Sequence, residues 1–507
     1  MRTRSLVSAA LIPALVSVCA SSVMPTAQAS LLAPKTAVVA PPVVPAQVLT
    51  PSNDSGAVSA PPIPAAFAAE LNSALGASAL GQDVTGQVTD SVTGEVLYSK
   101  ASNRPQRPAS TLKILTAITI LKAFGPDTRL STTVSLESGT DRLVIHGGGD
   151  STLARVQSPA AAWPAGQSAR PATLSSLAIQ TANALRKVGI VSAQLGFDDS
   201  LFVGSPLAPG WKSSFVAAGV VSPVMALSVD GGRISASSNA RSQDPAKAAA
   251  EYFAGRLREL GIRVAPAVTR VGKPADSPGV DPNQPVASSP VPNLTPSSPG
   301  QSSTGGSASP SSKGELTIAS VESPPVTDLV ERMLTRSDDD LAEALGHLAG
   351  GRLAGSASFE GGVRATKDTL EQMGMPVSGM QLADASGLSS LNEIDSQTFT
   401  HALAAVVANK PFTGSSVGVL WPVASGLPIA GLTGTLSDRY DAPKHLRGRG
   451  VVRAKTGTLT GVIGLAGIVR DTHGRVLIFD FDADKAPGPT EVARAAVDHA
   501  ASIVAAQ

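Results

Sequence analysis

The sequence predicts a mixed α/β (α+β) fold in which one sheet is assembled from strands near both ends of the chain. Residues 86–100 alternate apolar and polar side chains around Thr93-Gly94, which is typical of a hairpin. Three consecutive strands are expected at residues 451–459, 461–471 and 475–483. With 507 residues, of which 42% are apolar and 16% charged, the chain can bury the cores of two or three folding units.

Helices are expected between these strands and after them. The stretch PASTLKILTAITILKAF, residues 108–124, predicts one apolar helix that follows the hairpin. The last helix should begin at Pro489 and Thr490, because proline favours the first helical position and the residues that follow form an Ala-rich amphipathic pattern. Strands at both ends with helices between them therefore indicate a single α/β domain.

The charge balance argues against one class of partner. The chain carries 40 basic and 39 acidic side chains, which gives a formal net charge of +1. Proteins that bind a phosphate backbone need an excess or a run of basic residues. The sequence has neither, so no nucleic-acid partner is expected.

The first 29 residues have the layout of a secretory signal peptide. Arg2 and Arg4 precede an apolar run at residues 6–20, and a small-residue pattern predicts cleavage before Ser30. The alternative is an uncleaved membrane anchor, because residues 5–24 contain no charge.

The only cysteine, Cys19, lies in this segment, and its surroundings fit a lipoprotein site poorly. The mature chain should therefore contain neither disulfides nor thiol chemistry. We expect an exported protein of the periplasmic, cell-wall or extracellular space, which could associate peripherally with the membrane or the wall.

Two low-complexity tracts divide the rest of the chain. Residues 30–64 are rich in Pro, Ala and Val without periodicity, which is typical of an extended tether. Residues 272–313 are dense in Pro, Ser and Gly and predict a disordered loop, because they cannot bury enough apolar surface to offset their ordering entropy. This tract marks an insertion, so we expect one domain built from residues 65–128 and 319–507, interrupted by an inserted region at residues 129–318.

Ser110 and Lys113 are the first candidates for chemistry. They lie three residues apart near the start of the 108–124 helix, so their side chains should share one face. A serine hydroxyl is a poor nucleophile until a nearby base accepts its proton. A lysine can be that base if apolar neighbours and a second cation favour its uncharged amine. The spacing alone also fits a surface lysine near a helix start.

The segment Lys455-Thr456-Gly457-Thr458 offers the second cation, at the end of a predicted strand. The glycine would let a ligand approach the backbone, while the lysine and the hydroxyls could hold a carboxylate. An ordinary strand-edge lysine followed by a turn is the alternative.

These two motifs resemble the first and third motifs of penicillin-binding serine peptidases and serine β-lactamases. The family has Ser-x-Asn between them, and Ser337-Asp338-Asp339 before a predicted helix is the best match. Five further stretches resemble the class C low-molecular-mass penicillin-binding proteins, which are D-alanyl-D-alanine carboxypeptidases and endopeptidases: residues 143–153, 227–233, 384–392, 427–436 and 447–469.

The resemblance implies a penicillin-recognising, transpeptidase-like domain, with an antiparallel sheet flanked by helices and one or more inserted β-rich domains. Ser110 would attack the carbonyl of the penultimate D-alanine of a peptidoglycan stem peptide, and Lys113 would take its proton. Ser337 would relay a proton toward the leaving amine. The backbone N–H groups of Ser110 and Thr458 would form the oxyanion hole.

The resemblance also implies how the substrate is held and what inhibits the enzyme. The terminal carboxylate would be bound by the segment Lys455, Thr456, Gly457 and Thr458. Peptidoglycan stem peptides would be the substrates and β-lactam antibiotics covalent inhibitors. No metal or organic cofactor is implied, and the sequence contains no H-E-x-x-H zinc motif.

Asp339 departs from the family pattern, because it stands where the family has asparagine. An ionised carboxylate about 4 Å from Lys113 would favour the ammonium form by about 4 kcal/mol at an effective dielectric constant near 20. That preference opposes the role of Lys113 as a base, so Asp339→Asn should raise the rate of acylation. Ser390 stands where relatives often have arginine, so the preference for stem-peptide side chains cannot be carried over.

Three other functions fit parts of the sequence. Gly414-Ser415-Ser416-Val417-Gly418 matches the G-x-S-x-G nucleophile elbow of other serine hydrolases, but no strand is predicted before it. A wall-binding or scaffold protein with a degenerate active site is favoured by Asp339 and Ser390. A secreted β-lactamase would have no use for the inserted region. Carboxypeptidase and endopeptidase activity both remain open.

Overall fold

The computed structural model describes residues 63–157, 170–235, 237–272, 314–408 and 419–507. Several predicted features lie outside these ranges: the signal peptide, nearly all of the tether, the Pro/Ser/Gly loop and the nucleophile-elbow pattern. Within the described ranges, no helix combines the length and apolar content needed to span a membrane.

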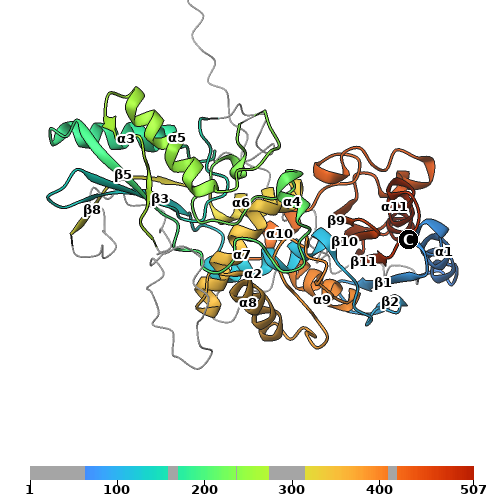
Figure 1. Cartoon of the computed structure of the whole chain (residues 1–507). Coiled ribbons are helices and arrows are strands. Elements are labelled where there is room, and N and C mark those ends of the chain that lie inside the picture. The colour runs from blue at the N-terminus through green and yellow to red at the C-terminus, as the bar shows by residue number, and fades with distance from the viewer. Residues whose placement is uncertain (1–62, 158–169, 236, 273–313, 409–418) are drawn as a thin grey trace, which may run out of the picture. The chain divides into compact units, whose positions relative to one another are not determined.

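One sheet consists of five antiparallel strands in the order β2-β1-β11-β10-β9 (Figure 1). The strands are β1 (Asp83–Asp90), β2 (Val96–Lys100), β9 (Val452–Leu459), β10 (Val462–Arg470) and β11 (Val476–Asp484). The first and last of these strands pair directly, from Asp83 opposite Asp484 to Asp90 opposite Leu477. The predicted hairpin, the three late strands and a sheet assembled from both ends of the chain are confirmed.

One face of this sheet is covered by α1 (Ala66–Leu75) and α11 (Thr490–Ala505), which also pack against each other. Leu465, Phe479 and Phe481 are fully buried beneath these two helices. Burying one such side chain contributes about 1.5–3 kcal/mol, so this face supplies an apolar core. The final helix begins after Pro489, as predicted.

The other face packs against a group of helices, which share a buried apolar cluster with Ala466, Ile468 and Ile478 of the sheet. The helices of this group are α2 (Lys113–Phe124), α6 (Val326–Arg336), α7 (Asp339–Ala354), α8 (Phe359–Gln372), α9 (Ser396–Val407) and α10 (Trp421–Gly426). Every residue of α2 from Lys113 to Leu121 is buried. Helix α2 is therefore a central helix of the domain.

The helix predicted at residues 108–124 is interrupted at its start. Residues Ala109–Leu112 form a 3₁₀ turn, η3, and α2 begins only at Lys113. Ala109 has a φ of +47°, a left-handed conformation that cannot belong to a right-handed helix. The α-helix pattern in the sequence is therefore correct for residues 113–124 and wrong for the turn before them.

Residues 131–322, which we call the inserted segment, supply a second sheet with the strand order β6-β5-β4-β3-β8 and with β7 paired to β5. The strands are β3 (Ser131–Glu137), β4 (Arg142–His146), β5 (Ser192–Asp198), β6 (Arg263–Val264), β7 (Thr269–Arg270) and β8 (Glu315–Glu322). Strand β4 is antiparallel to β3 and parallel to β5, so the sheet is mixed. The predicted boundary at residue 318 falls inside β8, which pairs with β3.

Helices also contribute to the inserted segment, which was expected only to be rich in strands. They are α3 (Leu174–Lys187), the single turn α4 (Ser214–Ala217) and α5 (Pro245–Glu259). Thr173 and Asp244 cap α3 and α5, each accepting a hydrogen bond from a backbone N–H three residues later. Both long helices pack against the second sheet and enclose an apolar core with it.

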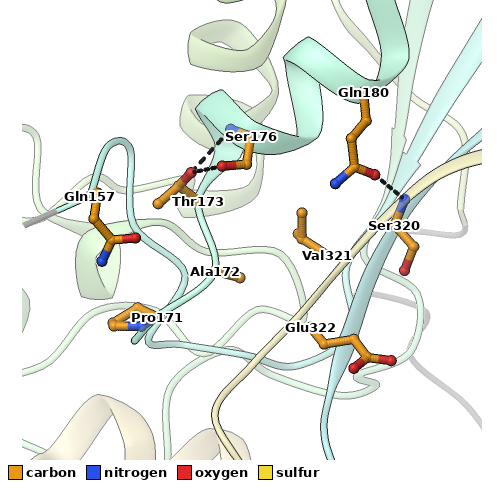
Figure 2. A pocket seen from close by; sticks show the side chains of 9 residues that line it. All are labelled: Gln157, Pro171, Ala172, Thr173, Ser176, Gln180, Ser320, Val321 and Glu322. Atoms are coloured by element: carbon orange, nitrogen blue, oxygen red, sulfur yellow. Dashed lines mark hydrogen bonds between the residues drawn. The ribbon is translucent and has the colours of Figure 1, made fainter. Parts of the chain in front are cut away.

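The inserted segment contains a pocket of about 440 Å³ between α3 and β8 (Figure 2). Its wall includes the side chains of Thr173, Gln180 and Glu322. The Gln180 Oε1 atom accepts a hydrogen bond from the backbone N–H of Ser320, at 3.3 Å. None of the predicted site residues lines this pocket.

Candidate active site

The predicted nucleophile and its neighbouring amine meet at the junction of η3 and α2. Lys113 is fully buried, whereas Ser110 is only half-buried. The Lys113 Nζ atom lies 3.1 Å from Ser110 Oγ. Residues i and i+3 of a 3₁₀ turn lie directly above one another, which explains why the turn brings the two groups together as well as an α-helix would.

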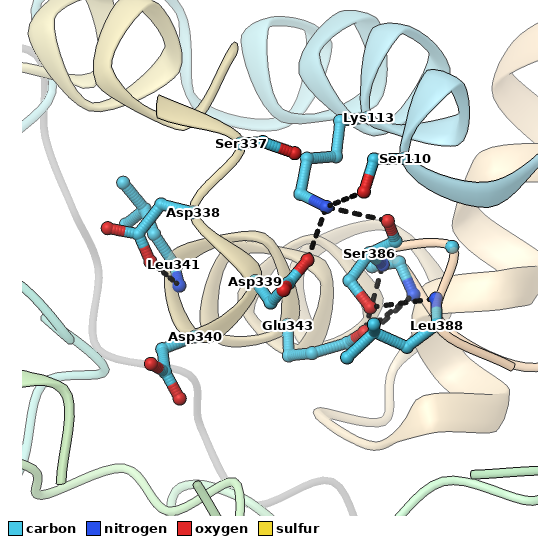
Figure 3. A network of polar contacts seen from close by, with 12 residues as sticks. Ser110, Lys113, Ser337, Asp338, Asp339, Asp340, Leu341, Glu343, Ser386 and Leu388 are labelled. Carbon is cyan, nitrogen blue, oxygen red and sulfur yellow. Dashed lines mark hydrogen bonds and ion pairs between the residues drawn. The ribbon is translucent and has the colours of Figure 1, made fainter. Parts of the chain in front are cut away.

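Three oxygen atoms surround the amine of Lys113 (Figure 3). Besides Ser110 Oγ, they are Oδ1 of Asp339 at 2.6 Å and the backbone carbonyl of Ser386 at 2.7 Å. An ammonium group would donate one N–H to each oxygen. An uncharged amine would donate to two of them and direct its lone pair at the third, which is the arrangement a base needs.

Asp339 is the first residue of α7, and its carboxylate points at Lys113, whereas that of Asp340 points away (Figure 3). The neighbouring Asp338 caps the helix by accepting a hydrogen bond from the Leu341 N–H at 3.1 Å. The ion pair is shorter than the 4 Å considered from the sequence. Burial raises the pKa of Asp339 above its ordinary value, although the charge of Lys113 pulls it down.

Ser337 and Lys455 form a second pair beside the first. The Lys455 Nζ atom donates to Ser337 Oγ at 2.9 Å and to the backbone carbonyl of Thr456 at 2.9 Å. Burial lowers the pKa of Lys455 well below its ordinary value, and the nearby charge of Lys113 lowers it further. The charge of Lys113 therefore lies close enough to affect the protonation of Lys455.

The predicted carboxylate-binding segment lies within β9 and not only at its end. Lys455 is the fourth residue of the strand, which continues to Leu459. The Thr456 hydroxyl makes a hydrogen bond of 2.8 Å with the hydroxyl of Thr435, and Thr458 pairs with Ile463 of β10. This strand lies at the edge of its sheet. On one side it pairs with β10, and on the other side residues 428–430 pair with its first half, at Val452 and Ala454.

Two glycines allow other backbone segments to pack closely on both sides of the turn that carries Ser110. A Cβ atom at Gly457 would lie 2.5 Å from the Pro108 carbonyl oxygen, so only glycine permits this contact between β9 and η3. A Cβ atom at Gly387 would lie 1.8 Å from the Ala109 carbonyl oxygen, and Gly387 has a φ of +88°. The turn that carries the nucleophile is thus held between two glycine backbones.

The sequence did not identify the Asp384–Ser389 loop, which presents the Ser386 carbonyl to Lys113. On one side of the loop, the buried carboxylate of Glu343 accepts hydrogen bonds from the backbone N–H groups of Ser386 at 2.8 Å and Ala385 at 3.1 Å. Burial raises the pKa of Glu343 to about 8, and the nearby carboxylate of Asp384 adds to this effect. The only signal was that residues 384–392 resemble a family stretch, which does not reveal that a backbone carbonyl is the functional atom.

No metal-binding group of three or more His, Cys, Asp or Glu side chains occurs in the part of the chain that the structure describes. The site instead combines a hydroxyl, two buried amines and a bridging hydroxyl. A half-buried serine beside a buried amine can form and break an ester, so the arrangement suits acyl transfer.

Comparisons with known proteins identify the family of the chain. The model of the D-Ala-D-Ala carboxypeptidase 3 (S13) family matches residues 67–241 and 303–505. Carboxypeptidase DacB of Mycolicibacterium smegmatis is 32% identical over 476 residues, which cover 93% of this chain and 89% of that protein. A carboxypeptidase of Mycobacterium tuberculosis is 30% identical over 430 residues, which cover 83% of this chain and 81% of that protein.

A solved structure shows the same fold. Penicillin binding protein 4 of Haemophilus influenzae superposes with a TM-score of 0.63 at 21% identity, covering 86% of this chain and 98% of that one. A second structure of that protein contains a bound β-lactam and has a TM-score of 0.59. From its sequence, its fold and its relatives, the chain belongs to the D-Ala-D-Ala carboxypeptidase 3 (S13) family and is an enzyme of the D-Ala-D-Ala carboxypeptidase class.

Proposed function

We propose that the chain is an exported serine peptidase, which cleaves the bond after the penultimate D-alanine of peptidoglycan stem peptides through an acyl-enzyme on Ser110. The observation that carries this proposal is the 3.1 Å contact between Ser110 Oγ and the buried amine of Lys113. The leaving group would be a terminal D-alanine in a carboxypeptidase reaction or a cross-linked side chain in an endopeptidase reaction.

Acylation begins when Ser110 Oγ attacks the carbonyl carbon of the D-alanine residue. The hydroxyl proton passes to the uncharged amine of Lys113, whose two N–H bonds can remain on Asp339 and the Ser386 carbonyl. The new C–O bond forms as the C=O bond becomes a C–O⁻ single bond. Backbone N–H groups of Ser110 and Thr458 are the proposed donors to this oxyanion.

Collapse of the tetrahedral intermediate breaks the C–N bond, and the leaving amine takes up a proton. Ser337 is the proposed relay, because its hydroxyl already accepts a hydrogen bond from Lys455 and can pass a proton onward. The proton that Lys113 accepted from Ser110 is returned in this step. Water then hydrolyses the ester, again with Lys113 as the proposed base.

The proposed binding of the substrate's terminal carboxylate rests on β9. Lys455 supplies a cation, and the hydroxyls of Thr456 and Thr458 follow one and three residues later in the same strand. An extended peptide can lie along the open side of an edge strand and form backbone hydrogen bonds with it. The stem peptide would therefore run along β9 toward Ser110.

Inhibition by β-lactams and export are part of the same proposal. A β-lactam carries a reactive amide and a carboxylate, the two groups that Ser110 and the β9 segment would engage in a substrate. The β-lactam complex of the Haemophilus influenzae protein supports this expectation by likeness. Export rests on the predicted signal peptide, and it would bring the enzyme to its substrate outside the cytoplasmic membrane.

One observation favours the alternative, a catalytically weak penicillin-binding or scaffold protein. The 2.6 Å contact between Asp339 and Lys113 would stabilise an ammonium group, which cannot accept the proton of Ser110. The raised pKa of Asp339 has the opposite effect, because a protonated, neutral carboxyl group does not favour the ammonium form of Lys113. The two functions therefore differ in the rate of acylation and not in the identity of the nucleophile.

Fluorescent penicillin tests the proposal directly. The purified protein should form a stable covalent adduct that survives denaturation, and Ser110→Ala should abolish it. Ser437→Ala, which removes an exposed hydroxyl elsewhere in the chain, is the matched control and should leave labelling unchanged. Absence of labelling in the unaltered protein would contradict the proposal.

Intact and cross-linked muropeptides then separate the activities. Release of D-alanine from intact pentapeptides shows a carboxypeptidase, and conversion of dimers into monomers shows an endopeptidase. Labelling without turnover of either substrate would favour the scaffold function. Rapid hydrolysis of penicillin would instead indicate a β-lactamase.

A further inference from the structure

Two of the three oxygens around Lys113 come from elements that the inserted segment also contacts. Asp339 begins α7, and Ser386 belongs to the loop at residues 384–389. The position of each oxygen relative to the amine decides whether the lone pair of an uncharged Lys113 can point at Ser110. Contacts that hold these two elements therefore influence the proposed base.

Trp211 of the inserted segment reaches the Ser386 loop. Its indole Nε1–H donates a hydrogen bond of 2.8 Å to Oδ2 of Asp384. The same carboxylate accepts hydrogen bonds from the backbone N–H groups of Gly387 at 2.9 Å and Ser389 at 2.6 Å. Asp384 is buried, so the loop is folded around a carboxylate that Trp211 holds from outside.

The indole ring is itself held in place by a residue outside the inserted segment. It packs edge-on against Phe359, the first residue of α8, with ring centroids 5.6 Å apart. Next to it, Ser389 Oγ donates to the Pro209 carbonyl at 2.6 Å, and the Ser390 N–H donates to the Gly210 carbonyl at 3.3 Å. With the 3.2 Å bond from Ser390 Oγ to the Gly210 carbonyl, four hydrogen bonds fix residues 209–211 to residues 384–390.

The loop between these contacts presents a single peptide unit to Lys113. The N–H of Ser386 points at Glu343 of α7, and its carbonyl points at the Lys113 amine (Figure 3). The Ser386 carbonyl and the Gly387 N–H belong to one peptide unit, and Asp384 binds that N–H. A shift of Asp384 would therefore move the Ser386 carbonyl. Trp211 and Glu343 therefore hold the loop from its two sides.

The inserted segment also binds the start of α7. Asp340, the residue after Asp339, accepts a hydrogen bond from the Ser222 N–H at 2.7 Å and forms an ion pair of 2.9 Å with the buried Arg241. Both oxygens that flank Lys113 are consequently tied to the inserted segment through one neighbouring carboxylate each.

We propose that Trp211 is a positioning residue, which holds Asp384 and thereby the Ser386 carbonyl that orients the amine of Lys113. The inserted segment then contributes to the rate at which Ser110 is acylated, without touching the reacting atoms. This inference rests on the proposed acylation of Ser110.

Trp211→Phe tests the inference, because phenylalanine keeps a ring against Phe359 but lacks the N–H. Rates of labelling should be measured at several concentrations of fluorescent penicillin, to separate the acylation rate constant from the dissociation constant of the non-covalent complex. We expect the rate constant to fall about tenfold or more and the dissociation constant to change less than twofold. Trp421→Phe, at the start of α10, is the matched control and should behave as the unaltered protein.

A double-mutant cycle with Asp384→Asn checks the route of the effect. If Trp211 acts through Asp384, its substitution should slow acylation much less in the Asp384→Asn background. Additive losses, or an unchanged rate in Trp211→Phe, would overturn the inference.

Ser389→Ala checks that slower acylation does not result from misfolding. It removes the hydrogen bond to the Pro209 carbonyl without altering a large side chain. It should slow acylation in the same direction while leaving the thermal midpoint nearly unchanged, and an unaltered rate would count against the inference. Failure of the unaltered protein to react with penicillin would overturn the proposed function itself, which is a different result from equal rates in the variants.

Discussion

The two sheets of the molecule bury charge in different ways. The five-stranded sheet directs Asp480 and Asp482 of β11 and Lys455 of β9 into a fully buried layer on the side of the helix group. None of the four carboxylate oxygens of Asp480 and Asp482 makes a well-formed hydrogen bond to the residues that the structure describes. The second sheet has an apolar interior, and its buried Asp199 forms an ion pair with Arg270.

This difference shows where the fold accepts destabilising groups. Two buried carboxylates that lie side by side, as Asp480 and Asp482 do, are unfavourable unless at least one is protonated. The Asp482 side chain lies beside Gly464, where an added Cβ would be 2.6 Å from Oδ1 and 3.3 Å from the side chain of Thr111 in η3. The unfavourable groups of the five-stranded sheet therefore lie behind the nucleophile turn. In the inserted segment, the buried Asp199 has a cationic partner, whereas the buried Asp150 keeps one carboxylate oxygen without a hydrogen bond to the described residues.

Replacing Lys113 should have the largest effect. Lys113→Met keeps the volume of the buried side chain but removes the proposed base, so acylation by fluorescent penicillin should slow by about 10³-fold or more. Lys187→Met, on the exposed side of α3 in the inserted segment, should leave the rate unchanged. If Lys113→Met and Lys187→Met were acylated at comparable rates, the nucleophile site and the inserted segment would not differ in the role of their lysines.

Gly387→Ala should come next, because it places a Cβ 1.8 Å from the Ala109 carbonyl oxygen. We expect a loss of about 2–4 kcal/mol in the free energy of unfolding, together with slower acylation. Gly374→Ala is the matched control, since Gly374 has a φ of +78° but nothing within 4 Å of an added Cβ. Both variants strain the backbone, but only Gly387→Ala adds a clash. The difference between their free energies of unfolding, measured by chemical denaturation, therefore gives the cost of the clash.

Asp339→Asn should raise the rate of acylation by about tenfold, equivalent to about 1.4 kcal/mol. The amide oxygen can still accept an N–H of Lys113, but the charge that favours an ammonium group is gone. Stopped-flow or gel-based labelling measures the rate. An unchanged or lower rate would refute the electrostatic role assigned to this carboxylate.

The last prediction concerns the pH dependence of stability. Burial raises the pKa of Asp480 to about 7 and that of Asp482 well above its ordinary value, with Asp480 adding to the latter. The folded protein thus keeps protons that the unfolded chain releases above about pH 4. The resulting stabilisation is complete below that pH and is lost as the pH rises through 7.

Replacing both residues by asparagine removes this titration. Relative to the unaltered protein, the double variant should gain about 1–3 kcal/mol in the free energy of unfolding between pH 5 and pH 8. Asp199→Asn, which disrupts the ion pair with Arg270, should lower stability at both pH values. Parallel pH profiles for the double variant and the unaltered protein would show that the buried layer does not titrate.

The sequence predicted the parts of the molecule that depend on local patterns. Alternating side chains and turn residues gave the correct positions of the hairpin and of β9, β10 and β11, and Pro489 marked the start of the last helix. Ser110, Lys113, Ser337 and Lys455 were selected by short motifs, and the structure brings them together.

The parts that were missed depend on contacts between distant residues. Ala109 has a left-handed conformation, and its carbonyl oxygen lies against Gly387, which is far away in the chain. The Ser386 carbonyl carries no side-chain signature, and Glu343 appears in the sequence only as one acidic residue of a predicted helix. The sequence contains capping residues for α3 and α5, namely Thr173 and Asp244. These helices were missed because the inserted region was expected to be rich in strands.

The conformation of Ser337 restricts how this enzyme can diverge. With φ at +55° and ψ at 46°, the residue ends α6 in a left-handed conformation while its hydroxyl meets Lys455. Glycine would relax the backbone but lose the hydroxyl, and threonine would keep the hydroxyl but add a branched Cβ that this conformation disfavours. Of these three residues only serine satisfies both demands, so substitution by either of the other two should cost the protein its backbone geometry or its contact with Lys455.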